Sequence, residues 1–125
     1  MINADLIQGI GDILDIEKTP FSNRVKVTTT LEAIEKGVCA NPDGTAIRFL
    51  PSGNDFNNPI LISYKELMGN IFRTANMLHD LGVRSDDVVT YLLPNLPQTH
   101  YILWGAEAAG IVNPVNPMLE PEAII

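Results

Sequence analysis

The sequence has few cysteines, few basic residues and no long apolar run. Its single cysteine, Cys39, excludes an internal disulfide framework and is typical of a protein in a reducing compartment. Eight basic residues stand singly among fifteen acidic ones, and the net charge is -7, so no basic face for nucleic acid or anionic lipid is evident. No run of about 18 apolar residues is present, so no transmembrane helix is expected. We therefore expect a cytoplasmic protein with no nucleic-acid partner and no transmembrane segment.

Motifs that hold nucleotides, phosphates or metals are also lacking. The segment 9–11 (GIG) has no third glycine and follows no expected strand, as a dinucleotide-binding fingerprint would require. Gly105 and Gly110 have the spacing of two phosphate-loop glycines, but Ile111 stands where the lysine is needed. The two histidines have no carboxylate or cysteine at ligand spacing, so a metal site is not expected.

A strand–helix–strand pattern covers residues 88–117. Val88–Leu93 is a run of β-branched, aromatic and aliphatic residues, typical of a strand buried on both faces. Pro97 suits the first position of a helix and Gly110 its end, after which residues 111–112 begin a second extended segment. A unit of this size favours a parallel pair of strands with a right-handed crossover.

Two helices and a hairpin are expected before this unit. Thr29 and Glu32 have the spacing of a capping box, so a helix is expected to begin at Thr29 and to end at Gly37. Thr45–Leu50 and Ile60–Ser63 are expected to pair as a hairpin around a long polar turn.

The clearest helix start is the capping box formed by Ser63 and Glu66. Apolar residues then recur at three- and four-residue steps and predict one stripe on a core: Leu67, Met68, Ile71, Phe72, Ala75, Leu78 and Leu81. Gly82 suits a left-handed position after the helix, and Val83 suits the hydrophobic contact that accompanies such a cap.

The two ends of the chain are expected to differ in character. Residues 1–28 are expected to form a short helix and an arm, and residues 29–125 the domain. The helical spacing in the arm involves Leu6, Ile7, Ile10, Ile13 and Leu14. Pro121 is typical of a helix start, and the chain stops at Ile125 just as that helix would bury apolar residues. We therefore expect a truncated product of a longer protein.

Three asparagines are the candidate cleft-lining residues. In open parallel sheets, ligands bind beyond the carboxyl ends of the strands. Asn95 follows the first expected strand, and Asn113 and Asn116 follow the start of the second, with prolines beside them. They either line a ligand cleft or, in the interpretation that their residue types favour, simply end the strands as turn residues. Trp104, in the intervening helix, is more typical of a core residue than of a ligand platform.

Several short segments, taken together and in order, resemble the N-terminal part of the adenylate-forming acyl-CoA synthetases. This AMP-binding superfamily also contains luciferases and peptide-synthetase adenylation domains. The segments are SYKEL at 63–67, ANML at 75–78, LGV at 81–83, DVV at 87–89, LPNLP at 93–97, AGIV at 109–112 and NP at 116–117. The resemblance covers residues 29–125, and residues 98–109 look most like fatty-acyl members. Asp86 departs from the glycine that the family often has there, at little cost because aspartate tolerates the left-handed region.

The resemblance implies an α/β fold, namely part of a parallel three-layer sheet with flanking helices plus a small β-hairpin, from the large domain of a synthetase. It implies a parent enzyme that joins a carboxylic acid to coenzyme A through an acyl-adenylate made from ATP, with Mg²⁺. The family's phosphate loop, Tyr-x-x-Thr-Glu segment, ribose-binding aspartate, hinge and C-terminal lysine are absent from these residues. No catalytic, cofactor-binding or metal-binding residue is therefore assigned.

Three hypotheses remain open. In the first, the chain is the N-terminal part of an acyl-CoA synthetase and is inactive alone, and its partners are the rest of that synthetase and a small carboxylate. Exposed apolar surface would then favour self-association. In the second, it is a non-catalytic interaction or scaffold module. In the third, it is a small flavodoxin-like nucleotide binder. The sequence does not determine the acyl substrate or the oligomeric state.

Overall fold

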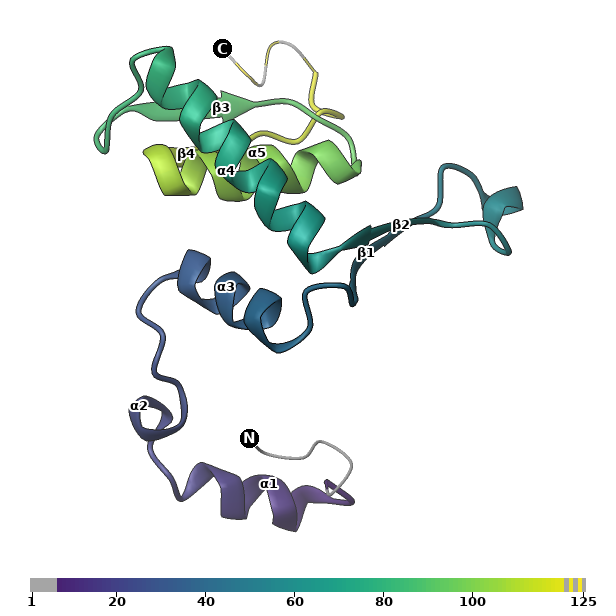
Figure 1. Ribbon diagram of the computed structural model, residues 1–125, viewed down its shortest axis with the longest axis vertical. Helices are drawn as coiled ribbons and strands as arrows, with labels where there is room; N and C mark the ends of the chain where they lie inside the picture. The colour runs from purple at the N-terminus through teal and green to yellow at the C-terminus, as the bar shows by residue number, and fades with distance from the viewer. Residues whose placement is uncertain (1–6, 121, 123, 125) are drawn as a thin grey trace.

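The computed structural model describes residues 7–120, 122 and 124 of the 125-residue chain. The elements in chain order are α1 (Ile10–Glu17), α2 (Phe21–Arg24), α3 (Thr30–Ala40), β1 (Thr45–Phe49), the short 3₁₀ helix η2 (Gly53–Asp55), β2 (Ile60–Ser63), α4 (Tyr64–Asp80), β3 (Val88–Tyr91), α5 (Pro97–Ala109) and β4 (Ile111–Pro114). Figure 1 shows α4 and α5 lying together with β3 and β4, and the segment with α1 and α2 extending away from them beyond α3.

The strand–helix–strand unit is confirmed as a parallel pair. β3 and β4 pair in register from Val88 opposite Ile111 to Tyr91 opposite Pro114, and α5 connects them. β3 ends at Tyr91 rather than at the predicted Leu93. The last hydrogen bond of the pair runs from the Val115 N–H to the Tyr91 carbonyl at 3.0 Å, and the next donor position on that strand is Pro117, which has no N–H.

Helices cover one face of this pair. Val89 and Val112 pack on the side of α4 and α5, against Leu78 and buried alanines of α5. On the other face Val88 and Ile111 are 59% and 51% exposed. The α/β class is confirmed, but burial of β3 on both faces is wrong for the residues that the structure describes, which supply no third layer over that face.

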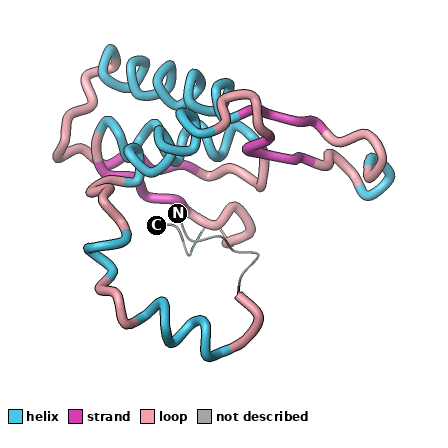
Figure 2. The backbone as a smooth tube through the Cα atoms, turned by 60° about the horizontal axis from the view of Figure 1, so that its bottom comes forward, coloured by secondary structure: helices cyan, strands magenta, loops and turns pink. Residues whose placement is uncertain are grey.

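The core forms where α4 crosses α5. Ile71 of α4 is fully buried and clusters with Ile62, Leu67 and Met68. The close crossing depends on Gly105 of α5. A Cβ at this position would lie 2.7 Å from Thr74 Cβ and 3.1 Å from the Ile71 carbonyl oxygen. Figure 2 shows these two helices together at one end of the molecule.

The caps of α4 are as predicted. Ser63 Oγ accepts the Glu66 N–H at 3.2 Å, and the Glu66 carboxylate accepts the Ser63 N–H at 3.5 Å. At the other end, Gly82 has a φ of 94°. The Val83 N–H donates to the Leu78 carbonyl at 3.0 Å, which completes a Schellman motif.

The predicted apolar stripe of α4 is correct for five of its seven positions, which are buried: Leu67, Met68, Ile71, Ala75 and Leu78. It is wrong for Phe72 and Leu81, which are 43% and 74% exposed. Phe72 lies about 100° around the helix from Ile71, beyond the width of the contact with α5. Leu81 is the C-cap residue, past the last turn.

Helix α3 starts at its predicted cap but ends later than predicted. Thr29 Oγ1 accepts the Glu32 N–H at 3.1 Å. The helix continues through Gly37 to Ala40, because Gly37 packs on the Tyr64 ring, where a Cβ would lie 3.0 Å from Cε1. This packing offsets the low helix propensity of glycine, and it places Cys39 on a helix, where it is exposed.

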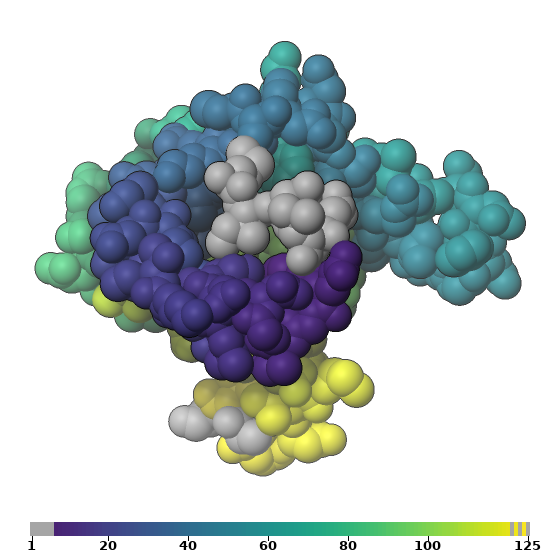
Figure 3. All heavy atoms as spheres, turned by 90° about the horizontal axis from the view of Figure 1, so that it is seen from below, coloured from purple at the N-terminus to yellow at the C-terminus, as the bar shows by residue number. Residues whose placement is uncertain are grey.

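The hairpin is confirmed, and it extends away from the helices. β1 pairs antiparallel with β2 from Thr45 opposite Ser63 to Phe49 opposite Ile60, with an irregularity near Ala46. β1 ends one residue before the predicted Leu50. The space-filling view in Figure 3 shows the hairpin (teal) projecting to one side of the molecule.

Helix α1 overlaps the short helix expected near the N-terminus but continues to Glu17, and its apolar residues Ile10, Ile13 and Leu14 are exposed. Leu6 of the same predicted pattern and Pro121, where a further helix was expected, lie outside the described residues. In the part of the chain that the structure describes, no helix combines the length and the apolar character needed to cross a bilayer.

Candidate functional site

The three asparagines predicted to line a cleft are all exposed. Asn113, in β4, donates from Nδ2 to Thr90 Oγ1 at 3.2 Å across the strand pair. Asn116 Oδ1 accepts the Met118 N–H at 3.0 Å, and Asn95 lies between β3 and α5. The Asn113 bond joins neighbouring strands and the Asn116 bond closes a local turn, as expected of strand and turn residues. Their role as walls of a cleft stays a prediction.

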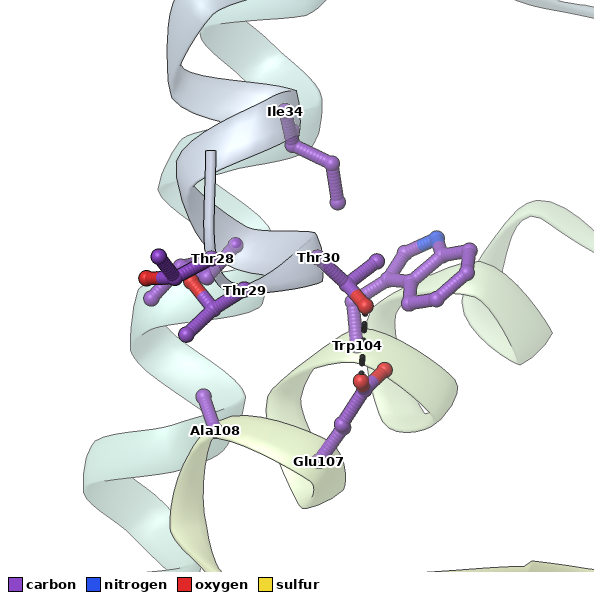
Figure 4. A pocket seen from close by; sticks show the side chains of 8 residues that line it. Thr28, Thr29, Thr30, Ile34, Trp104, Glu107 and Ala108 are labelled. Carbon is purple, nitrogen blue, oxygen red and sulfur yellow. Dashed lines mark hydrogen bonds between the residues drawn. The ribbon is translucent and has the colours of Figure 1, made fainter. Parts of the chain in front are cut away.

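A cavity lies instead where the N-terminal end of α3 meets α5. Its volume is about 440 Å³, within the range of small-ligand pockets. It is lined by Thr28, Thr29, Thr30, Leu31, Ile34, Trp104, Glu107 and Ala108. Figure 4 shows side chains from both helices meeting around it. We call this the α3–α5 cavity.

One hydrogen bond joins the two walls of the α3–α5 cavity. Thr30 Oγ1 donates to Glu107 Oε1 at 2.8 Å, across 77 residues of sequence (Figure 4). Thr30 is half-buried and belongs to the first turn of α3, whereas Glu107 is exposed and belongs to the last turn of α5. The bond therefore fixes a polar contact between the two helices in a cavity whose lining is partly polar and partly apolar.

Trp104 serves both the core and the cavity. It packs against the cluster around Ile71, as the sequence favoured, together with Leu31 and Ile34 of α3. It also lines the α3–α5 cavity, which the sequence analysis did not foresee. Trp104 and Glu107 are three residues apart on one helix, a spacing that places both on one face. The α5 wall of the cavity, with Trp104 and Glu107, could therefore have been found from the sequence.

Hydrogen bonds in the first turn of α3 favour the charged form of the Glu32 carboxylate. Glu32 accepts hydrogen bonds from the Thr28 N–H at 2.7 Å and from Thr28 Oγ1 at 3.0 Å. These bonds, chiefly the one from the backbone, hold the pKa of Glu32 below its usual 4.5. The Lys36 ammonium acts in the same direction.

Replacing Glu32 with glutamine should remove a part of the stability that depends on pH. A carboxyl group whose pKa is lowered by folding stabilises the fold above its unfolded pKa, and this contribution is lost as the pH falls through the folded pKa. Urea unfolding at about pH 7 and about pH 3 measures it. We expect wild type and Glu32→Gln to differ more at the higher pH. An equal difference at both values, or the same behaviour in Glu35→Gln, would contradict this role.

Comparison with known proteins decides the family. The model of the family described as AMP-binding enzyme matches residues 34–125, which is most of the chain. This chain belongs to the AMP-binding enzyme family. The resemblance seen in the sequence is therefore confirmed.

The curated relatives of this AMP-binding chain include a CoA ligase and an acetyl-coenzyme A synthetase. The marinolic acid–CoA ligase of a Pseudoalteromonas species is 35% identical over 113 residues, covering 90% of this chain and 17% of the relative. The acetyl-coenzyme A synthetase of Methylorubrum extorquens strain PA1 is 30% identical over 90 residues, covering 72% of this chain and 14% of the relative. The chain thus spans less than a fifth of the length of these relatives.

Solved structures share the fold of the AMP-binding chain. The N-terminal subdomain of Klebsiella oxytoca NpsA aligns with a TM-score of 0.67 and 17% identity, over 78% of this chain and 24% of that one. A putative long-chain-fatty-acid CoA ligase from Rhodopseudomonas palustris aligns with a TM-score of 0.66 and 21% identity, over 77% of this chain and 23% of that one. At these identities the likeness shows the fold alone.

The described residues of the AMP-binding chain offer no metal cluster for the Mg²⁺ that such ligases use, and the α3–α5 cavity offers no cationic partner for the phosphates of their ATP and coenzyme A. Among them, no three histidine, cysteine, aspartate or glutamate residues gather closely enough to hold a metal ion. The described residues that line the α3–α5 cavity include no lysine or arginine that would pair with phosphate. His79 and His100 lie on α4 and α5, and His79 Nδ1 lies 3.1 Å from the Val83 carbonyl oxygen.

One further ionisable group is perturbed. Burial raises the pKa of the Tyr101 hydroxyl, and the Glu66 carboxylate adds to the shift. Tyr101 packs against the core around Ile71. A phenol kept neutral at the contact of two helices fits a structural role.

Proposed function

We propose that this chain forms the N-terminal part of a ligase that joins a carboxylic acid to coenzyme A through an acyl-adenylate, and that it has no ligase activity alone. The observation that carries the proposal is the 35% identity to marinolic acid–CoA ligase over 90% of the chain. Among the described residues, the α3–α5 cavity has no cationic partner for phosphate and no cluster could hold Mg²⁺, which supports the second half.

For the substrate, we propose a fatty acid. The amino-acid sequence of residues 98–109 is similar to that of fatty-acyl synthetases. The proposal is limited to fatty acids as a substrate class. The enzyme would act in the cytoplasm, which the single cysteine favours.

We propose further that the exposed face of β3 and β4 meets the rest of the synthetase. Val88 and Ile111 lie side by side on it and are about half exposed. Parallel sheets are normally covered on both faces, so this surface needs a partner. In its absence, the isolated chain should self-associate through the same face, and a monomeric mass by light scattering at high concentration would contradict this.

Two exchange assays test the ligase proposal. The purified 125-residue chain should show no carboxylate-dependent exchange between ATP and pyrophosphate. A chimaera of marinolic acid–CoA ligase, with its matching N-terminal segment replaced by this chain, should retain the exchange of the parent ligase. Unmodified marinolic acid–CoA ligase is the matched control.

The outcomes separate the two halves of the proposal. Exchange by the chain alone would overturn its inactivity. A chimaera that folds cooperatively and lacks exchange would overturn the N-terminal assignment and favour the non-catalytic module instead.

A further inference from the structure

We propose that the α3–α5 cavity binds a small alkylammonium ligand, with the Glu107 carboxylate and the Trp104 indole on its charged group and apolar side chains along its carbon chain. This goes beyond the ligase proposal, because no described lysine or arginine of the cavity lining would pair with the phosphate of an acyl-adenylate.

Charge favours a cation. Of the described residues that line the α3–α5 cavity, Glu107 alone is acidic or basic. Its Oε1 accepts the Thr30 hydroxyl, and the described residues form no ion pair with it. One carboxylate oxygen therefore remains for a ligand. An ammonium group there would gain both a hydrogen bond and a charge partner.

The N-terminal end of α3 does not reverse this preference. A free helix N-terminus attracts anions. Here the Glu32 N–H is already capped by Thr29 Oγ1, and the Glu32 carboxylate adds a negative charge to the first turn. Lys26 and Lys36 line a different, smaller cavity together with Glu35 and Glu32. The first turn therefore does not favour an anion.

The aromatic face adds a second attraction. Figure 4 shows the Trp104 indole beside Thr30, with Glu107 on the same helix. Tryptophan is the side chain whose face attracts ammonium groups best, and the attraction adds to that of a nearby carboxylate. Trp104 and Glu107 thus offer one charged group two sources of stabilisation.

The remaining lining suits a short carbon chain. Leu31 and Ile34 of α3 and Ala108 of α5 provide apolar surface next to the polar contact. A volume of about 440 Å³ holds a small molecule of this kind. An amine with a few methylene groups therefore matches both parts of the cavity. A carboxylate of the same length would meet Glu107 with like charge.

The chain carries its own reporter for this binding. Trp104 is its single tryptophan, so intrinsic fluorescence reports on the cavity. We would titrate the full 125-residue chain with n-butylammonium chloride, with 1-butanol as the neutral match and with sodium butyrate as the anionic match. We expect a saturable change with butylammonium, binding about fivefold weaker or more for 1-butanol, and no saturation with butyrate.

A matched pair of variants isolates the carboxylate. Glu107→Gln keeps an oxygen that accepts the Thr30 hydroxyl but removes the charge, and should weaken butylammonium binding about fivefold. Glu35→Gln removes an exposed carboxylate that lies on α3 outside the cavity, and should leave binding unchanged. Circular dichroism of both variants establishes that each is folded.

A third arm distinguishes the source of the ammonium group. The same chemistry is offered by a free amine and by a lysine side chain of another protein, so N-acetyl-lysine amide is titrated alongside. We expect it to bind no better than butylammonium, and a tenfold gain would overturn the assignment to a free amine.

Equal affinity for butylammonium and 1-butanol, no saturable change, or equal effects of the two glutamate variants would overturn the proposal itself.

Discussion

Ile71→Ala should lower the free energy of unfolding by about 2–5 kcal/mol. Ile71 is fully buried at the centre of the cluster formed by α4, β2 and the flanking side chains. Truncation removes apolar atoms from contact and leaves a cavity, because α4 and α5 are held too closely by their crossing to collapse into it. Urea unfolding followed by circular dichroism measures the loss.

Phe72→Ala is the matched control for this substitution. Phe72 is the next residue on the same helix and has the larger side chain, but it is 43% exposed. Its truncation should change the free energy of unfolding by no more than about 1 kcal/mol. Similar losses for the two variants would show that the core does not lie where the structure places it.

The difference between Ile71 and Phe72 also marks what sequence alone could predict. Local features were predictable: Ser63 and Glu66 form their capping box, and Gly82 adopts its left-handed conformation. These depend on residues within one turn of each other. The width of the buried stripe depends on how many elements pack on α4, and periodicity carries no such information. Gly37 was misjudged for the same reason, since its neighbour Tyr64 is distant in sequence.

The candidate site was predictable only in part. Trp104 and Glu107 share a helix face by their spacing, and that much is visible in the sequence. Their meeting with Thr30 depends on the packing of α3 against α5, across 77 residues. The asparagines were chosen by a rule for complete open sheets. The described part of this chain has only one parallel pair of strands, with one face exposed. The rule applies to complete sheets and therefore does not apply well to this pair.

Gly105→Ala should destabilise the chain by about 1–3 kcal/mol, as overpacking of a close contact does. Alanine is otherwise the better helix former, so propensity alone would predict a gain. The new Cβ would lie 2.7 Å from Thr74 Cβ and 3.1 Å from the Ile71 carbonyl oxygen, and the second of these is backbone that cannot rotate away. Thermal unfolding followed by circular dichroism measures the sign and size of the change.

Gly69→Ala separates crowding from helix propensity. Gly69 is also a glycine inside a helix, but a Cβ there would meet only the Arg73 guanidinium, at 3.4 Å, which is the flexible end of a side chain. The substitution should therefore stabilise by up to about 1 kcal/mol. Opposite signs for the two variants would establish that α5 is held against α4 by contact at Gly105. Because Trp104 and Glu107 flank Gly105 on α5, the destabilising variant should also shift the Trp104 emission, and Gly69→Ala should leave it unchanged.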